Sequence, residues 1–402
     1  MLRERRPALP TFPLVLWLGL RLLSSFVAAF ASDLRPITIL EQQMSLWPPG
    51  RPFSLWLERV LIAPWERWDA LWYARIVAFG YAPDDGTAQF HPLYPWLAVP
   101  LARLGLPPVL ALLVVSTLAA LAALIVFHRL AEREVGPLQA PFSTLLFATF
   151  PVAFVLFAPY PEALFLLWTT LTLMWAREGR WWAAGAAGGL AALTRQQGIF
   201  LALPLAWELW AAHRRAEKGQ RPPAWYEWTS LLLIPLGYGL WTAYRFFVLR
   251  DASPDLSSPN RLIYSLLISP SASQVVPNQA FLWPWEALRR AVLHLFRTGD
   301  IATACDLILG GFFIVLTLLA WRHLRGSDQI YVAAVTLVAF SYYTGPLHPY
   351  MGLPRHLLLA LPIFLPLGKV LRRRWLRWMG LSLHIFGWMF MTLLYGLHAW
   401  VL

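Results

Sequence analysis

Cysteine and charged residues are both scarce in this sequence. A single cysteine, Cys305, excludes an intrachain disulfide framework and any metal site built from several cysteines. Only 13% of the 402 residues are charged, against about 25% in an ordinary soluble domain. Because hydrophobic residues make up 58% of the chain, a soluble enzyme and a disordered chain are both excluded.

Metal-ligand spacings and a continuous basic surface are also missing. No His-x-x-x-His pair and no carboxylate pair with metal-ligand spacing accompanies the histidines. The formal net charge of +12 could indicate a nucleic-acid partner, but the basic residues fall in short clusters between apolar stretches rather than on one face. We therefore expect no metal, no other cofactor and no nucleic acid, and interpret the basic clusters as membrane-topology signals.

Apolar stretches of about twenty residues recur from end to end, each long enough to cross a ~30 Å hydrocarbon core as a helix. They predict an all-α protein that crosses the lipid bilayer many times, with one domain over residues 1–402. The predicted spans, eleven in number, are 12–31, 108–127, 138–158, 161–176, 181–194, 198–212, 228–248, 303–321, 330–345, 356–371 and 378–400. The short pair 181–194 and 198–212 could instead form a re-entrant hairpin.

Basic clusters between the spans predict the orientation of the chain. They are Arg3, Arg5 and Arg6; His128, Arg129 and Arg133; Arg177 and Arg180; Arg214, Arg215, Lys218 and Arg221; Arg322 and Arg325; and Arg372 to Arg374 with Arg377. If the N-terminus is cytoplasmic, every cluster lies on the cytoplasmic side, as the positive-inside rule requires. The protein is then a multi-pass protein of the cell membrane, and its first span is a signal anchor.

Two long segments, 32–107 and 249–302, lie outside in this topology, and long ordered loops are usually functional. Residues 92–106 are apolar but too short and too rich in proline to span the bilayer, so we expect an interfacial helix there. A second interfacial helix is predicted around residue 290, because one apolar stripe runs along it with three arginines elsewhere around the helix. The stripe is formed by Trp285, Leu288, Val292, Leu295 and Phe296, and the arginines are Arg289, Arg290 and Arg297.

Polar and ionisable residues gather at the outer ends of the predicted spans. They are Trp65 to Asp69, then Tyr73, Arg75, Gly80, Tyr81 and His91 to Pro95, then Tyr160 to Glu162, then Thr194 to Gly198, and finally His348, Arg355 and His356. Ionisable groups at membrane depth are costly and usually mark a substrate or ion pathway. Four distant stretches of the chain thus predict one site at the outer membrane face.

Structural explanations exist for the same residues. A carboxylate at the start of a helix can cap it or interact with its dipole, which applies to Asp69 and Glu162. An arginine near the interface can extend to phospholipid headgroups, which applies to Arg195 and Arg355. Hydrogen bonding at an interface, without any ligand, would also explain three histidines: His91, His348 and His356.

Several of these segments resemble motifs of a known family. The "WDxxxYxxIAxxGY…FFPLYP" signature of the GPI mannosyltransferase 2 (PIG-V-like) family is similar to Trp68-Asp69-Ala70-Leu71-Trp72-Tyr73-Ala74-Arg75-Ile76, Gly80-Tyr81 and Phe90-His91-Pro92-Leu93-Tyr94-Pro95. Its "Y-[ST]-E-[SA]-L-F", "TRxxG" and "PRY" segments resemble Tyr160-Pro161-Glu162-Ala163-Leu164-Phe165, Thr194-Arg195-Gln196-Gln197-Gly198 and Pro354-Arg355-His356. The four matches occur in order, share the predicted outer side and cover most of the chain.

This sequence also departs from the family pattern. His91 stands where a second Phe is usual, Pro161 where a small hydroxyl residue is usual, and His356 where Tyr is usual. These positions bear on the acceptor pocket more than on the chemistry. The chain is short and rich in proline and arginine, with Lys218 and Lys369 as its lysines, and so resembles the prokaryotic branch, for which a GPI acceptor is not expected.

The resemblance implies a membrane-embedded glycosyltransferase of the glycosyltransferase C superfamily. Such an enzyme transfers a hexose, here mannose, from a polyprenyl-phosphate donor to a hydroxyl of a glycolipid or other membrane-associated acceptor, with inversion. Asp69 would be the general base. Arg195 and Arg355 would bind the donor phosphate, with His348 or His356 in support. The acceptor or sugar would contact the other candidates: Trp68, Tyr73, His91, Tyr94, Tyr160, Glu162 and Gln196.

A transporter or flippase for a lipid-linked sugar or another anionic lipid is the main alternative, because it would use the same arginines for binding without chemistry. Transporters commonly show internal repeats with discontinuous helices in both halves. The sequence shows no such repeat, and a long outer segment with a Trp-Asp motif is hard to explain in a transporter. A scaffold subunit of a glycosylation complex is a third interpretation.

Overall fold

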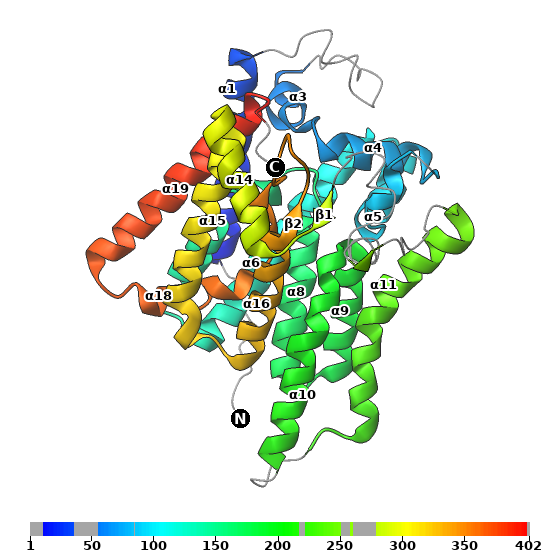
Figure 1. Ribbon diagram of the computed structural model, residues 1–402, viewed down its shortest axis with the longest axis vertical. Coiled ribbons are helices and arrows are strands. Elements are labelled where there is room, and N and C mark those ends of the chain that lie inside the picture. Colours follow the sequence, from blue (N-terminus) through cyan, green and yellow to red (C-terminus); the bar gives the residue numbers. More distant parts are fainter. Residues whose placement is uncertain are drawn as a thin grey trace.

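The computed structural model describes residues 11–35, 55–83, 85–216, 222–250, 258–259 and 279–399. Within these ranges the chain is predominantly helical, which confirms the predicted all-α class (Figure 1). The helices are α1 (Thr11–Leu34), α3 (Trp56–Leu61), α4 (Asp69–Phe79), α5 (Leu93–Arg103), α6 (Pro108–Val135), α7 (Ala140–Ala148), α8 (Glu162–Arg177), α9 (Trp181–Thr194), α10 (Ala202–Ala216), α11 (Leu233–Tyr244), α14 (Pro284–Thr298), α15 (Ile301–Ala320), α16 (Gly326–Ser341), α17 (Leu353–Leu358), α18 (Leu367–Val370) and α19 (Arg374–Gly396). Two short strands, β1 (Ala280–Phe281) and β2 (Tyr342–Tyr343), pair antiparallel.

Five of the described helical segments are long and apolar enough to cross a membrane. They are Thr11–Leu34, Pro108–Val135, Trp225–Leu249, Ile301–His323 and Arg374–Gly396. These segments coincide with five of the predicted spans, and the protein is a multi-pass membrane protein as expected. The remaining predicted spans correspond to shorter or interrupted helices, so the count of eleven stays a prediction.

Two predicted spans are not continuous helices, and that part of the prediction is wrong. The span 138–158 consists of α7 and the 3-10 helix η3 (Ala153–Leu156), separated at Pro151. The span 356–371 is divided among α17, η8 (Leu361–Phe364) and α18, where prolines remove backbone donors. The chain from 357 to 368 is buried, which is where irregular backbone at membrane depth is tolerated.

The pair of short spans 181–194 and 198–212 lies in the middle of the helical bundle. Here α9 packs between α8 and α11, which run side by side with it in the green part of Figure 1. Small residues make this packing possible: a Cβ added at Gly185 would lie 2.3 Å from the carbonyl oxygen of Ser230, and one at Gly189 would lie 2.6 Å from that of Leu233. Close packing therefore explains the run of glycine and alanine in α9.

Both helices predicted in the outer segments are present. The apolar stretch 92–106 contains α5, and the amphipathic pattern around residue 290 forms α14. On α14, Ala287 and Ala291 are buried against the protein, whereas Phe296 is 83% exposed, as an interfacial helix requires. Glu286 accepts hydrogen bonds from Arg289 and Arg290, and these bonds lower the pKa of Glu286 to about 2. The membrane position of both helices stays a prediction.

Charged side chains are concentrated at the two ends of α8. At one end, Arg177 pairs with Glu134 at 2.8 Å and with Asp328. At the other end, Glu162 is the first residue of the helix. Sixteen residues of α-helix extend roughly 22 Å between these ends. Apolar helix separates the two charged groups, and Arg177 lies at the end of α8 that is predicted to be cytoplasmic.

The orientation can be tested at the two ends of α15 with single cysteines in a Cys305→Ser background. Arg297 and Arg322 are both exposed; Arg297 precedes the start of this helix and Arg322 follows its end. We expect Arg297→Cys to react with a membrane-impermeant maleimide in intact cells, and Arg322→Cys to react only after permeabilisation. The opposite labelling pattern would show that the predicted orientation is inverted.

Candidate active site

The candidate site is built around Asp69, the first residue of α4. The N-cap of α4 is Trp68, and Asp69 makes no capping hydrogen bond, so capping does not explain this carboxylate. Instead, Oδ2 of Asp69 accepts a hydrogen bond of 2.6 Å from Nη1 of Arg355. The side chain of Asp69 is 33% exposed, which leaves the carboxylate accessible from outside the protein.

The turn that presents Asp69 is strained and held by buried contacts. Trp68 has a φ of 54°, a left-handed conformation that is unusual for a bulky residue and costs on the order of 1–3 kcal/mol. The preceding Arg67 is buried and donates to the backbone oxygens of Tyr395 and Gly396 at 2.9 Å, at the end of α19. Trp65 packs against Tyr395 with a ring distance of 5.7 Å. The Trp65–Trp68 segment is therefore an anchor that sets the position of the carboxylate.

Glu162 is the second carboxylate of the site and lies at the start of α8. Its side chain is completely buried. One oxygen, Oε1, accepts hydrogen bonds from both Nη1 of Arg195 and Nε of Arg355. The other oxygen, Oε2, has no hydrogen-bond partner among the described residues. Asp69, Glu162, Arg195 and Arg355 thus form one connected group, which we call the charged cluster.

Arg195 is positioned by a sharp return of the chain after α9. It has an extended backbone conformation and is followed by the 3-10 helix η4 (Gln196–Leu201). A Cβ added at Gly198 would lie 2.3 Å from the backbone nitrogen of Ala192, so only glycine lets η4 pack against the end of α9. This contact gives a physical reason for the glycine in the Thr-Arg-Gln-Gln-Gly segment.

Arg355 connects the two carboxylates from the opposite side of the cluster. It lies on α17, which begins after Gly352, and its guanidinium sits 4.6 Å from the ring centre of Tyr160. The side chains of Arg355 and Arg195 are 9% and 11% exposed. Both arginines point into the protein and pair there, so extension to phospholipid headgroups does not describe their positions.

His356 lies next to the charged cluster. Its Nδ1 faces two donors, Nη2 of Arg195 at 3.5 Å and Nε2 of Gln197 at 3.4 Å. Because both partners are donors, Nδ1 is an acceptor in these long contacts and the ring is the neutral Nε2–H tautomer. The ring of Tyr342 packs on His356 at 5.7 Å.

Gln197, and not the predicted Gln196, makes the glutamine contacts to the cluster. Gln196 is half-buried at the start of η4, whereas Gln197 is buried and contacts both Arg195 and His356. Tyr342 was also missed. Which of the two adjacent glutamines faces the cluster depends on how the 3-10 helix η4 turns after Arg195. The sequence alone does not predict that turn.

Several other predicted residues lie in the packed interior beside the cluster. Tyr73 and Tyr94 are buried and pack edge to face at 5.0 Å. The hydroxyl of Tyr94 is hydrogen-bonded to Ser116 at 2.7 Å and donates to the carbonyl of Leu112. His348, by contrast, is only partly buried in the loop before α17, where its backbone oxygen accepts a hydrogen bond from Thr344. The interior contacts of Tyr94 support a packing role.

His91 is also buried, and its partner is a backbone group of α9. Its Nδ1 lies 2.8 Å from the carbonyl oxygen of Ala192 and therefore carries a proton. Burial lowers the pKa of His91 to about 3, so the ring is neutral at physiological pH. A neutral histidine in this contact joins the first outer segment to the end of α9, close to Arg195.

We expect His91→Phe, the residue usual in the resembling family, to destabilise the protein by about 1–3 kcal/mol, because the Ala192 carbonyl loses its donor. The pH dependence has a defined sign. A lowered pKa means that the stability due to neutral His91 is complete above pH 6.5 and is lost as the pH falls toward 3. Melting curves in detergent should therefore show a difference between wild type and variant that shrinks below pH 6.5. A difference independent of pH would contradict the neutral assignment.

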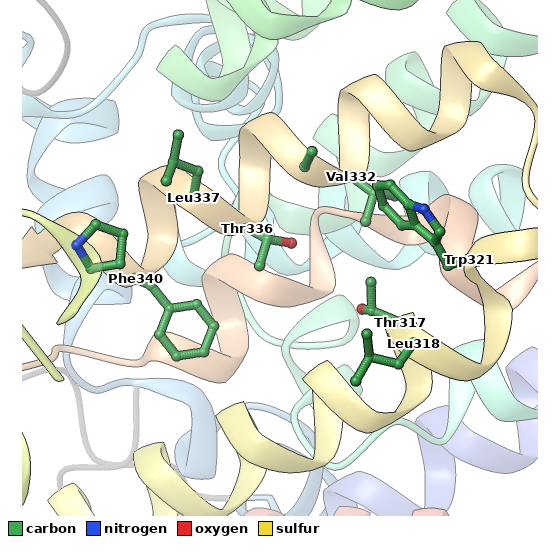
Figure 2. A pocket seen from close by; sticks show the side chains of 9 residues that line it. Thr317, Leu318, Trp321, Val332, Thr336, Leu337 and Phe340 are labelled. Carbon is green, nitrogen blue, oxygen red and sulfur yellow. The ribbon is translucent and has the colours of Figure 1, made fainter.

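A cavity of about 450 Å³ lies between α15 and α16, beside the first residue of α14 (Figure 2). Its lining is Pro284, Thr317, Leu318, Trp321, Val332, Ala333, Thr336, Leu337 and Phe340. These side chains are almost all apolar and none belongs to the charged cluster. No lining residue is charged, so the candidate site is taken to be the charged cluster and not this cavity.

The charged cluster has the groups needed to bind an anion and to accept a proton. Two guanidinium groups supply fixed positive charge and several N–H donors, which match a phosphate. Asp69 supplies an accessible carboxylate next to them. Within the described ranges, no three histidine, cysteine or carboxylate side chains are grouped as a metal site requires.

No protein-family model matches this chain, and no curated protein matches its sequence. Among solved structures it is similar to ArnT from Cupriavidus metallidurans bound to undecaprenyl phosphate, with 16% identity and a TM-score of 0.48 over 90% of this chain and 60% of that one. It is also similar to the apo state of that ArnT, with 18% identity and a TM-score of 0.43 over 76% of this chain and 54% of that one. A third similar structure is the Archaeoglobus fulgidus oligosaccharyltransferase in complex with Zn and sulfate, with 15% identity and a TM-score of 0.42 over 94% of this chain and 53% of that one. The chain spans between 53% and 60% of the length of these structures.

Proposed function

We propose that this protein is a membrane-embedded glycosyltransferase of the glycosyltransferase C type. It transfers a hexose, mannose by the family resemblance, from a polyprenyl-phosphate donor to a hydroxyl of a glycolipid or other membrane-associated acceptor. The observation that carries the proposal is the pairing of Asp69 with Arg355, beside Arg195 and Glu162, at one end of the helical bundle. In the predicted topology this end lies on the extracytoplasmic side of the cell membrane.

The reaction is a single displacement at the anomeric carbon. Asp69 accepts a hydrogen bond from the acceptor hydroxyl and takes its proton as the acceptor oxygen bonds to the anomeric carbon. The bond from that carbon to the phosphate oxygen breaks, and its electron pair leaves with the polyprenyl phosphate. The configuration at the anomeric carbon is inverted.

The leaving phosphate is stabilised by Arg195 and Arg355. Guanidinium groups keep their charge at every physiological pH and bind phosphate oxygens in a bidentate manner. Each arginine has five N–H donors, of which the contacts to Glu162 and Asp69 use only some. His356 orients Arg195 through Nδ1 rather than adding positive charge, because that nitrogen faces donors.

The acceptor and the sugar are expected to meet the cluster from the exposed side of Asp69. Trp68 precedes this carboxylate and offers an aromatic surface, while Gln196 is half-buried in η4. The departures from the family pattern at His91 and His356 fall close to this region, so the acceptor should differ from a GPI precursor.

A turnover assay separates the enzyme from a transporter. Purified protein in detergent is incubated with polyprenyl-phosphate mannose and a panel of membrane glycolipids, and release of polyprenyl phosphate is measured. Detergent solution has no compartments, so a transporter or flippase leaves the donor intact. Release that depends on an acceptor supports the transferase, and an intact donor with every acceptor refutes mannosyl transfer.

A further inference from the structure

We propose that Glu162 is a positioning residue that fixes Arg195 and Arg355 for the donor phosphate and does not itself contact the sugar or the acceptor. The inference rests on the proposed function and replaces the sugar or acceptor contact expected for Glu162. It follows from the different environments of the two carboxylates in the charged cluster.

Glu162 is inaccessible, whereas Asp69 is not. The side chain of Glu162 is 0% exposed, and one of its oxygens accepts from both guanidinium groups. Removing one partner of a buried ion pair leaves an uncompensated charge, which is strongly unfavourable. Glu162 therefore stays paired with its arginines, and a sugar hydroxyl has no route to its carboxylate in this arrangement.

The shared carboxylate also explains how two like charges are held together. Arg195 follows α9 and Arg355 lies on α17, so their guanidinium groups come from distant parts of the chain. Two guanidinium groups held close together repel each other, and a negative charge between them offsets this repulsion. Glu162 supplies that charge from the buried side and leaves other N–H donors of both arginines for the phosphate.

Asp69 is then the exchangeable partner of Arg355. Its contact uses Nη1 of Arg355, and its side chain is one third exposed. An incoming phosphate can take the place of Asp69 at Nη1, while Nε remains on Glu162. Donor binding in this way frees the Asp69 carboxylate for the acceptor hydroxyl.

The test compares Glu162→Gln and Glu162→Asp with wild type, using polyprenyl-phosphate mannose as donor. Without the charge the arginines must be ordered by the donor itself, so we expect Glu162→Gln to bind donor about tenfold more weakly and to turn over more slowly. The acceptor KM should not change. Glu162→Asp retains the charge and should recover part of the donor affinity. A raised acceptor KM with unchanged donor affinity would overturn the proposal.

Asp328→Asn is the matched control, because Asp328 is a buried carboxylate paired with a buried arginine, Arg177, at the other end of α8. We expect it to lower the yield of folded protein without changing the donor affinity of the folded fraction. If Glu162→Gln does not fold, the donor affinity and the acceptor KM of Glu162→Asp are compared with those of wild type instead. Weaker donor binding with an unchanged acceptor KM supports the positioning role, and the reverse pattern overturns it.

A second measurement isolates the route of action. In an Arg195→Ala, Arg355→Ala background, Glu162→Gln should no longer weaken donor binding, because a positioning residue weakens binding only through its arginines. An undiminished effect there would show a direct contact. Wild-type protein without turnover would refute the proposed function itself, whereas active wild type with an unaffected Glu162→Gln variant would refute only this inference.

Discussion

Asp69→Asn is expected to reduce sugar transfer by roughly 10²- to 10⁴-fold, the range that a general base contributes. Asparagine has the shape of aspartate and can still accept a hydrogen bond from Arg355, so the charged cluster should stay assembled. It cannot take the proton of the acceptor hydroxyl. The measurement is the rate of polyprenyl phosphate release at saturating donor and acceptor, with donor affinity determined separately.

Asp300→Asn serves as the control for this substitution. Asp300 is a carboxylate at the start of a helix, where it accepts a hydrogen bond of 2.9 Å from the backbone nitrogen of Thr303. Asparagine is an equally good N-cap, so this variant should retain both folding and turnover. Near-wild-type turnover of Asp69→Asn would show that the proton goes elsewhere.

The second large effect is expected at Arg355. Arg355→Ala removes a charged hydrogen-bond donor to the phosphate, a contact worth about 1.5–3 kcal/mol, so donor binding should weaken roughly ten- to a hundredfold. Arg355→Lys keeps the charge but loses the planar fork that reaches both Glu162 and Asp69. Donor binding by the lysine variant should therefore lie between those of wild type and the alanine variant.

Arg177→Lys provides the comparison at the opposite end of α8. Arg177 is buried and pairs with two carboxylates, as Arg355 does, but it lies on the predicted cytoplasmic side. Its substitution should affect the amount of folded protein and not the donor affinity. An Arg355→Lys variant with wild-type donor affinity would mean that Arg195 alone recognises the phosphate.

Much of the charged cluster could be predicted from the sequence because topology places residues on one side of a membrane. Asp69, Glu162, Arg195 and Arg355 are up to 286 residues apart. Glu162, Arg195 and Arg355 nevertheless fall at outer ends of predicted spans, and Asp69 falls in the predicted outer segment 32–107. Charge bias in the loops and the length of each apolar stretch were sufficient for that prediction. In the structure, direct contacts connect all four.

The pairing within the cluster could not be predicted. A single sequence does not show which guanidinium meets which carboxylate. The family motif therefore predicts a sugar or acceptor contact for Glu162 and gives no sign of its two arginine contacts. The hydrogen bond from His91 to Ala192 joins residues 101 positions apart and was equally inaccessible. Such contacts depend on the packing of α9 against its neighbours, where glycines permit a close approach.

Hydropathy also failed to separate continuous spans from interrupted helices. Residues 356–371 are as apolar as a transmembrane helix, but Pro362 and Pro366 interrupt the hydrogen-bonding pattern, and buried surroundings compensate for the break. The same reasoning applies to 138–158. The mean hydropathy of a window reports only that a segment is apolar. A buried irregular segment can be as apolar as a transmembrane helix.

An experimental structure of the protein with a bound polyprenyl phosphate would test the donor site most directly. We expect the phosphate to lie within hydrogen-bond distance of both Arg195 and Arg355. Nη1 of Arg355 should have exchanged Asp69 for a phosphate oxygen, while Glu162 remains paired with both arginines. A phosphate bound away from these two arginines would contradict the assignment of the charged cluster as the donor site.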